Sequence, residues 1–169
     1  ILTALAEGVG TLRRYCRGED CLNTMRALQA LGVRIDETKD ELQIHGKGLW
    51  GLAEPGGIID CGNSGTGIRL LTGLLAGQDF FTVLTGDASI RRRPMGRIVK
   101  PLREMGATIA GRKGGELAPL AVTGTTLRAI TYASPVASAQ VKSSLLLAAL
   151  FAEGTSRLSE PRRSRDHTE

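Results

Sequence analysis

The chain has 169 residues, with 22 Lys and Arg against 17 Asp and Glu, so its formal net charge is +5. Hydrophobic residues make up 41% and charged residues 23%, which excludes a disordered or collagen-like chain and fits one globular domain. Aromatic residues are only 4%, so Leu, Ile, Val and Ala must build the core.

Helix and strand patterns alternate along the chain, and glycine follows most of the helices. Asp20 is the expected N-cap of one helix, and Pro94 is expected in the first turn of another. In chain order the predicted elements are a strand over 11–15, a helix over 20–31, a strand over 42–45, a helix over 64–76, a strand over 80–84, a helix over 94–105, strands over 120–123 and 127–132, a helix over 138–152 and a strand over 155–158.

These elements repeat. Residues 4–12 (ALAEGVGTL), 73–84 (GLLAGQDFFTVL) and 149–158 (ALFAEGTSRL) each combine a helix end, a glycine and an outgoing strand. The spacing is roughly 70–80 residues, and each unit follows the order helix, strand, helix, strand, strand. Two units are nearly whole and a third begins. Such units cover their apolar faces only by packing on one another, although chance likeness between α/β segments is the alternative.

Composition also limits the class of protein. The longest apolar run covers 145–152, far short of the ~20 residues that span a bilayer, and we see no secretory leader. Cys16, Cys21 and Cys61 contain no CxxC pair, which favours neither a disulfide framework nor a zinc site. We expect a cytoplasmic protein with no metal and no membrane segment. Because the chain begins at Ile1 and stops within a charged stretch, we expect it to be part of a longer protein.

The sharpest motif is CGNSGTGIRL over 61–70, a glycine-rich loop that enters a helix. Glycine lets the backbone approach a ligand, and a helix N-terminus presents unpaired N–H groups to it. Arg69, about one turn into that helix, suits a phosphate or carboxylate. The spacing matches neither a Walker loop nor a dinucleotide fingerprint. The motif therefore favours anion binding, with an ordinary glycine-rich helix entry as the alternative.

Three further segments carry polar chemistry. GDASIRRRP over 86–94 concentrates arginines before a helix. This segment is either an anion site or a solvated basic loop. SPVASAQVKSS over 134–144 could bind a polyol or a phosphate at a helix start. The alternative is that its hydroxyl residues only cap the helix. EPRRSRDHTE over 160–169 is dense in charge, and we expect no catalytic role for its lone His167. Basic charge is spread over the chain and aromatics are few, so we expect no nucleic-acid partner.

In this order the four segments resemble the enolpyruvyl transferases, in particular the shikimate-pathway branch of that family. The runs that carry the likeness are GNSGTGIRLLTGLLAG, TGDASIRRRPMGRIVKPLREMGA, PVASAQVKSSLLLAAL and SRDHTE. The resemblance implies an α/β (α+β) fold of repeated βαβαββ units, an inside-out barrel with helices inside and mixed sheets outside. It also implies transfer of the enolpyruvyl group of phosphoenolpyruvate to the 5-hydroxyl of shikimate 3-phosphate, with no cofactor.

The resemblance also assigns residues. Asn63, Gly65, Thr66 and Arg69 would form the phosphoenolpyruvate loop, and Arg93 would pair with its phosphate. Shikimate 3-phosphate would be held by three consecutive residues and one arginine, with Gln140 reaching both substrates: Ser138, Ala139, Gln140 and Arg165. Arg162 is a weaker candidate for the phosphate contact than Arg165.

The resemblance further implies that residues 1–169 are most of the N-terminal-type domain. The family's N-terminal Lys-Ser run and the second domain, which supplies the acid/base carboxylates, are missing, so no catalytic residue can be named and we expect this chain alone to be inactive. We also expect either self-association or marginal stability, because a missing domain leaves apolar faces uncovered. The alternatives are a UDP-N-acetylglucosamine enolpyruvyl transferase, whose usual cysteine is absent from 88–92, and a non-catalytic or RNA-processing relative of the same repeat fold.

Overall fold

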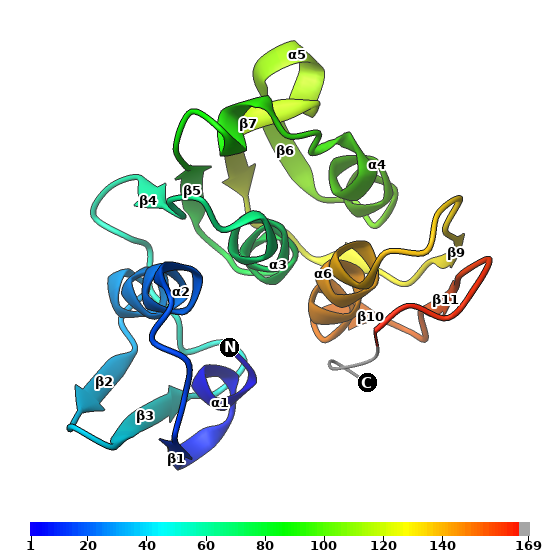
Figure 1. Ribbon diagram of the computed structural model, residues 1–169. Helices are drawn as coiled ribbons and strands as arrows, with labels where there is room; N and C mark the ends of the chain where they lie inside the picture. Colours follow the sequence, from blue (N-terminus) through cyan, green and yellow to red (C-terminus); the bar gives the residue numbers. More distant parts are fainter. Residues whose placement is uncertain (166–169) are drawn as a thin grey trace.

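The computed structural model describes residues 1–165 and contains the predicted repeat (Figure 1). The first unit consists of α1 (Leu2–Leu5), β1 (Glu7–Arg13), α2 (Glu19–Ala30), β2 (Arg34–Glu37) and β3 (Glu41–Lys47). Its strands form an antiparallel sheet in the order β1-β3-β2.

The second unit repeats this topology and adds one strand. It consists of β4 (Ile59–Asp60), α3 (Gly65–Ala76), β5 (Phe81–Thr85), the 3-10 turn η1 (Ile90–Arg92), α4 (Gly96–Glu104), β6 (Thr108–Gly111), α5 (Arg112–Gly115) and β7 (Leu117–Thr123). The sheet order is β4-β5-β7-β6, so β5, β7 and β6 match β1, β3 and β2. Because β4 pairs parallel with β5, the main elements read βαβαββ, which confirms the expected unit.

A third unit begins in the same way. Strands β8 (Leu127–Arg128) and β9 (Thr131–Ala133) precede α6 (Ala139–Ala149), and β10 (Ala152–Glu153) and β11 (Arg157–Ser159) follow it. β10 pairs parallel with β8 and β11 with β9, as β5 does with β4. In the second and third units, a strand that follows the central helix therefore pairs parallel with a strand that precedes it.

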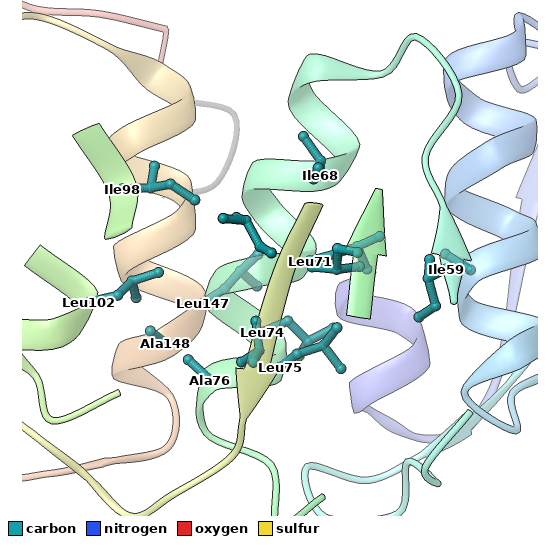
Figure 2. Close-up of a cluster of buried hydrophobic side chains, with 14 of the residues drawn as sticks. Ile59, Ile68, Leu71, Leu74, Leu75, Ala76, Ile98, Leu102, Leu147 and Ala148 are labelled. Atoms are coloured by element: carbon teal, nitrogen blue, oxygen red, sulfur yellow. The ribbon is translucent and has the colours of Figure 1, made fainter. Parts of the chain in front are cut away.

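Helices occupy the interior and the sheets lie outside them, with α3 between α2 and α6 (Figure 1). Most of α3 is buried, as a helix that is apolar on all sides must be. Its leucines, including Leu71 and Leu74, lie between Leu147 of α6 and Ile59 (Figure 2), and Ile98 of α4 belongs to the same core. Gly73 permits close packing there, because a Cβ at this position would overlap the Ser144 carbonyl oxygen of α6.

Several predicted boundaries are wrong. Asp20 does not cap α2: Gly18 is the N-cap, and Asp20 lies in the first turn, where its charge suits the helix dipole. Pro94 precedes α4, which begins at Gly96 with Met95 as its N-cap, and the Pro94 carbonyl accepts from Arg69. The helix predicted over 138–152 ends at Ala149, since Ala152 already pairs in β10.

The strand boundaries differ as well. The strand predicted over 11–15 is β1, which begins at Glu7, and the strand predicted over 127–132 is divided into β8 and β9. The division follows from pairing, because β8 and β9 have different partners. Within residues 1–165, no helix has both the length and the apolar character needed to cross a membrane.

Candidate functional site

The glycine-rich loop, the arginine-rich segment and the start of α6 meet at Arg69. The Arg69 side chain is 5% exposed and donates from Nη1 to the carbonyl of Gly65 at 2.9 Å and to Oε1 of Gln140 at 2.8 Å. Its Nη2 donates to the carbonyl of Pro94 at 2.9 Å. One buried guanidinium thus joins three segments that are far apart in the sequence. Nη1 and Nη2 of Arg69 are engaged by protein acceptors, whereas its buried Nε has no partner among the described residues, so the guanidinium holds the site together rather than projecting from it.

The loop before α3 is shaped by local hydrogen bonds. Ser64 is the N-cap, and its Oγ accepts a bond from the Gly67 N–H at 3.0 Å. Gly62 has a φ of +54°, and Asp60 Oδ1 accepts its N–H at 2.8 Å. A Cβ at Gly65 would lie 2.7 Å from Nη1 of Arg93, so only glycine lets this arginine lie against the helix start.

Arg93 is held over the loop by neutral groups. Its Nη2 donates to Oδ1 of Asn63 at 2.9 Å and to Oγ of Ser89 at 3.3 Å. The Asn63 amide in turn donates to Oδ2 of Asp87 at 2.7 Å. Hydrogen bonds from the Ile90 N–H and from Asn63 lower the pKa of Asp87 below its usual value, so this carboxylate stays ionised. Asp87 therefore orients Asn63 toward Arg93.

The start of α6 completes the arrangement. Ser138 caps the helix, its Oγ accepting a bond from the Val141 N–H at 3.4 Å, and Ala139 is the first helical residue. Gln140 contacts both the loop and its arginine, because its Nε2 donates to Oγ1 of Thr66 at 2.9 Å while its Oε1 accepts from Arg69. Gln140 thus fixes α6 to the start of α3.

Glu160 ties the C-terminal segment to the same place. Its Oε1 accepts the Ser138 N–H at 2.9 Å, its Oε2 pairs with Nζ of Lys142 at 3.3 Å, and both oxygens accept from the Ser164 hydroxyl. The hydrogen bond from Ser164, followed by those from Ser138 and Lys142, lowers the pKa of Glu160. Arg165, exposed, follows directly in the chain. The remainder of the SRDHTE run, including His167, lies outside the described residues.

The site is electropositive. Burial, and then the positive charges of Arg97 and Arg93, lower the pKa of Arg69 to about 10, so it remains charged at neutral pH. The hydrogen bonds of Arg69 and Arg93 go only to neutral oxygen atoms in residues 1–165. Such an arrangement favours a bound anion.

The predicted site residues can now be placed. Six are joined by hydrogen bonds or by close packing around Gly65: Asn63, Gly65, Thr66, Arg69, Arg93 and Gln140. Ser138 and Ala139 adjoin Gln140, and the exposed Arg165 follows Ser164, which donates to Glu160. Sequence reasoning missed the supporting groups Asp87, Glu160 and Arg97. Only Asp87 carried a signal, as an Asp in a turn before a short helix.

Comparisons with known proteins show the family of this chain. The model of the family described as EPSP synthase (3-phosphoshikimate 1-carboxyvinyltransferase) matches residues 1–169. The chain is similar to the 3-phosphoshikimate 1-carboxyvinyltransferases of Pelobacter propionicus, at 60% identity over 169 residues, and of Geobacter metallireducens, at 58%. All of this chain is covered, but only 39% of each relative.

A solved structure gives the same result for the fold. The EPSP synthase of Acinetobacter baumannii superposes with a TM-score of 0.95 at 48% identity, over 98% of this chain and 38% of that one. The chain thus spans well under half the length of the relatives that it matches. Since the family model covers every residue, the chain belongs to the EPSP synthase (3-phosphoshikimate 1-carboxyvinyltransferase) family.

Proposed function

We propose that residues 1–169 are most of the N-terminal-type domain of an enzyme that transfers the enolpyruvyl group of phosphoenolpyruvate to the 5-hydroxyl of shikimate 3-phosphate. The products would be 5-enolpyruvylshikimate 3-phosphate and phosphate. The observation that carries the proposal is the pair of guanidiniums at the start of α3, Arg69 and Arg93, whose hydrogen bonds go to neutral acceptors. The partly exposed Arg93 can therefore pair with a multiply anionic substrate, while the charge of the buried Arg69 adds to the positive potential there.

Phosphoenolpyruvate would lie over the start of α3. Asn63 and Thr66 are exposed there, while Arg93 is partly exposed and presents its guanidinium beside Gly65. The helix dipole at the start of α3 adds to the attraction for phosphate. Arg69, which is buried, would act by holding the loop and Gln140 in place.

Shikimate 3-phosphate would lie at the start of α6. Ser138, Ala139 and Gln140 are all partly exposed at this helix N-terminus, and Arg165 follows the segment held by Glu160. Gln140 would contact both substrates, because it already bridges Thr66 and Arg69.

The reaction needs a proton delivered to the methylene carbon of phosphoenolpyruvate and another removed from the 5-hydroxyl. We propose that the carboxylates for both steps belong to the second domain of the whole enzyme, which must close over the bound substrates. On this proposal the 169-residue chain binds substrate without turning it over, and a measurable turnover rate for it would contradict this part.

The test is a calorimetric titration of the chain with shikimate 3-phosphate, repeated with Gln140→Ala and Arg165→Ala. Each change should weaken binding about ten-fold, the effect of losing one charge-assisted hydrogen bond. Gln29→Ala and Arg157→Ala, at exposed positions elsewhere, are matched controls and should bind as the parent does. UDP-N-acetylglucosamine should not compete. Binding that is absent at millimolar ligand, or that both site variants retain, would refute the assignment.

We also propose that the isolated chain self-associates or is only marginally stable. Large apolar side chains are exposed on several elements, among them Val9, Ile58, Phe81 and Val136. Such surface favours association when it is contiguous. Sedimentation at increasing protein concentration measures this, and a sharp, concentration-independent monomeric melt at high temperature would contradict it.

A further inference from the structure

Asp87 joins the glycine-rich loop to the arginine-rich segment at two points. Its N–H donates to the carbonyl of Gly62 at 2.9 Å, and its Oδ2 accepts from the Asn63 amide at 2.7 Å. Its other oxygen, Oδ1, accepts the Ile90 N–H at 2.8 Å, at the start of η1. A Cβ at Gly86 would lie 2.5 Å from the Gly62 carbonyl oxygen, so the two segments approach closely there. Asp87 therefore lies where these segments are fixed to each other.

The Asn63 side chain lies between a group that only accepts hydrogen bonds and a group that only donates them. On one side is the ionised carboxylate of Asp87, which has no proton to donate. On the other side is the Arg93 guanidinium, whose Nη2 donates to Oδ1 of Asn63 at 2.9 Å and which has no acceptor. One orientation of the amide satisfies both neighbours, with its nitrogen toward Asp87 and its oxygen toward Arg93. The two charged groups thus fix the amide before any ligand binds.

The amide also keeps the two charges apart. Within residues 1–165, Arg93 donates to the neutral oxygens of Asn63 and Ser89, and no salt bridge joins it to Asp87. A carboxylate bonded directly to the guanidinium would neutralise it and compete with a ligand for its N–H groups. With Asn63 as a neutral spacer, Arg93 is held beside Gly65 while its charge stays uncompensated.

We propose that Asp87 is a positioning residue of the anion site, which acts through Asn63 to hold the Arg93 guanidinium against the start of α3 for the phosphate of phosphoenolpyruvate. The identity of the anion rests on the proposed function. Asp87 does not touch the substrate, and its own negative charge opposes an anion. Its contribution to binding therefore comes from geometry, through the relay Asp87–Asn63–Arg93.

The substitution Asp87→Asn separates the geometry from the charge. The new side-chain oxygen can still accept the Ile90 N–H, but the new side-chain nitrogen faces the nitrogen of Asn63. Asn63 must then rotate its amide, which turns that nitrogen toward Arg93 and removes an acceptor from the guanidinium. If Asp87 were only a nearby acid, removing its charge would strengthen anion binding. A positioning role predicts weaker binding, so the direction of the change decides between the two.

The first experiment titrates the 169-residue chain with inorganic phosphate in a calorimeter. We expect Asp87→Asn to bind phosphate about ten-fold more weakly than the parent, the effect of losing one charge-assisted hydrogen bond. Asp79→Asn is the matched control, because it removes the same charge at an exposed position beyond the other end of α3, and it should not weaken binding. In an Asn63→Ala background, Asp87→Asn should cause no further weakening, since the relay is already interrupted.

A second variant tests the separation of the charges and does not depend on the folding of Asp87→Asn. Asn63→Asp places a carboxylate directly against Nη2 of Arg93, so phosphate should bind at least about ten-fold more weakly than to the parent. Phosphate binding at the parent's affinity would overturn the role of Asn63 as a neutral spacer.

The second experiment needs no ligand. The side-chain resonances of Asn63 and Arg93 should shift in Asp87→Asn relative to the parent, and thermal melts verify that the variant folds. Unchanged resonances, tighter phosphate binding by Asp87→Asn, or an undiminished effect of this substitution in the Asn63→Ala background would each overturn the proposal. If the parent did not bind phosphate while these resonances shifted, the relay would be supported and the proposed placement of phosphoenolpyruvate would be refuted.

Discussion

Helices α3 and α6 are in backbone contact at Gly73, and the substitution Gly73→Ala tests what this contact holds together. The added Cβ would overlap the carbonyl oxygen of Ser144 and lie 2.7 Å from its Oγ. Ordinary van der Waals separation requires the helices to move apart by about 1 Å. The hydrogen bond from Ser144 Oγ to the Arg69 carbonyl, 2.8 Å long, would then exceed the limit for such a bond.

Effects of opposite sign decide whether Gly73→Ala raises or lowers the free energy of unfolding. Alanine in place of glycine in a helix interior gains about 1 kcal/mol. Overpacking against a backbone atom costs up to about 3 kcal/mol, and the lost hydrogen bond costs about 1 kcal/mol more. We therefore expect a net destabilisation of up to about 3 kcal/mol, or a melting temperature lower by as much as roughly 6–12 °C.

Urea unfolding monitored by circular dichroism measures this change. Gly56→Ala is the control, because a Cβ there meets nothing within 4 Å, and it should shift stability by less than about 0.5 kcal/mol. Affinity for shikimate 3-phosphate should fall as well, since displacing α6 separates Gln140 from Thr66. If Gly73→Ala were as stable as the parent or more stable, helix propensity alone would explain the result and the close α3–α6 contact would be refuted.

Three further substitutions address the site itself. Arg69→Lys keeps the charge but cannot reach Gly65, Pro94 and Gln140 together, so calorimetry should show at least about ten-fold weaker substrate binding, and unchanged binding would contradict the role of Arg69. Gly65→Ala should displace Arg93 Nη1 and crowd Nη1 of the buried Arg69, which the added Cβ would approach to 3.0 Å, so phosphate binding measured by titration should weaken and the melting temperature should fall. The lowered pKa of Glu160 means that its contacts stabilise the fold above its ordinary pKa of 4.5 and are lost as pH falls through the lowered value. Melting curves from pH 3 to 7 should therefore show a smaller acid loss for Glu160→Gln than for the parent.

Local chemistry made part of the fold predictable from the sequence. The glycine-rich turn followed by an apolar run placed the start of α3 at Ser64 or Gly65, where Ser64 is the N-cap, and the helix ends at Ala76 as predicted. Asp20 carried a similar pattern but lies inside α2. Gly18 and Asp20 are both residue types that can serve as an N-cap there. Burial of Ala27 and Leu28 fixes which face of the helix lies toward the interior.

The site was predictable as a set of residues but not as an arrangement. Arg69 and Gln140 are 71 positions apart, and no local pattern shows that they share a hydrogen bond. The repeat indicated only that units pack together, whereas the site depends on which helices meet. The role of Glu160 was hidden for the same reason, since its partner Ser138 is 22 residues away.

The repeat architecture explains why the proposed anion site would lie at this contact. Helices α3 and α6 hold equivalent places in successive units, so packing them side by side brings two helix N-termini, with their unpaired N–H groups, together. Arg69 crosses between them to Gln140, and burial with two neighbouring arginines destabilises its charge, as its lowered pKa shows. A bound anion relieves that repulsion, and the same contact at Gly73 that stabilises the interior sets the distance between the two helix starts. Binding and folding therefore depend on one interface, and changes that loosen it should reduce both together.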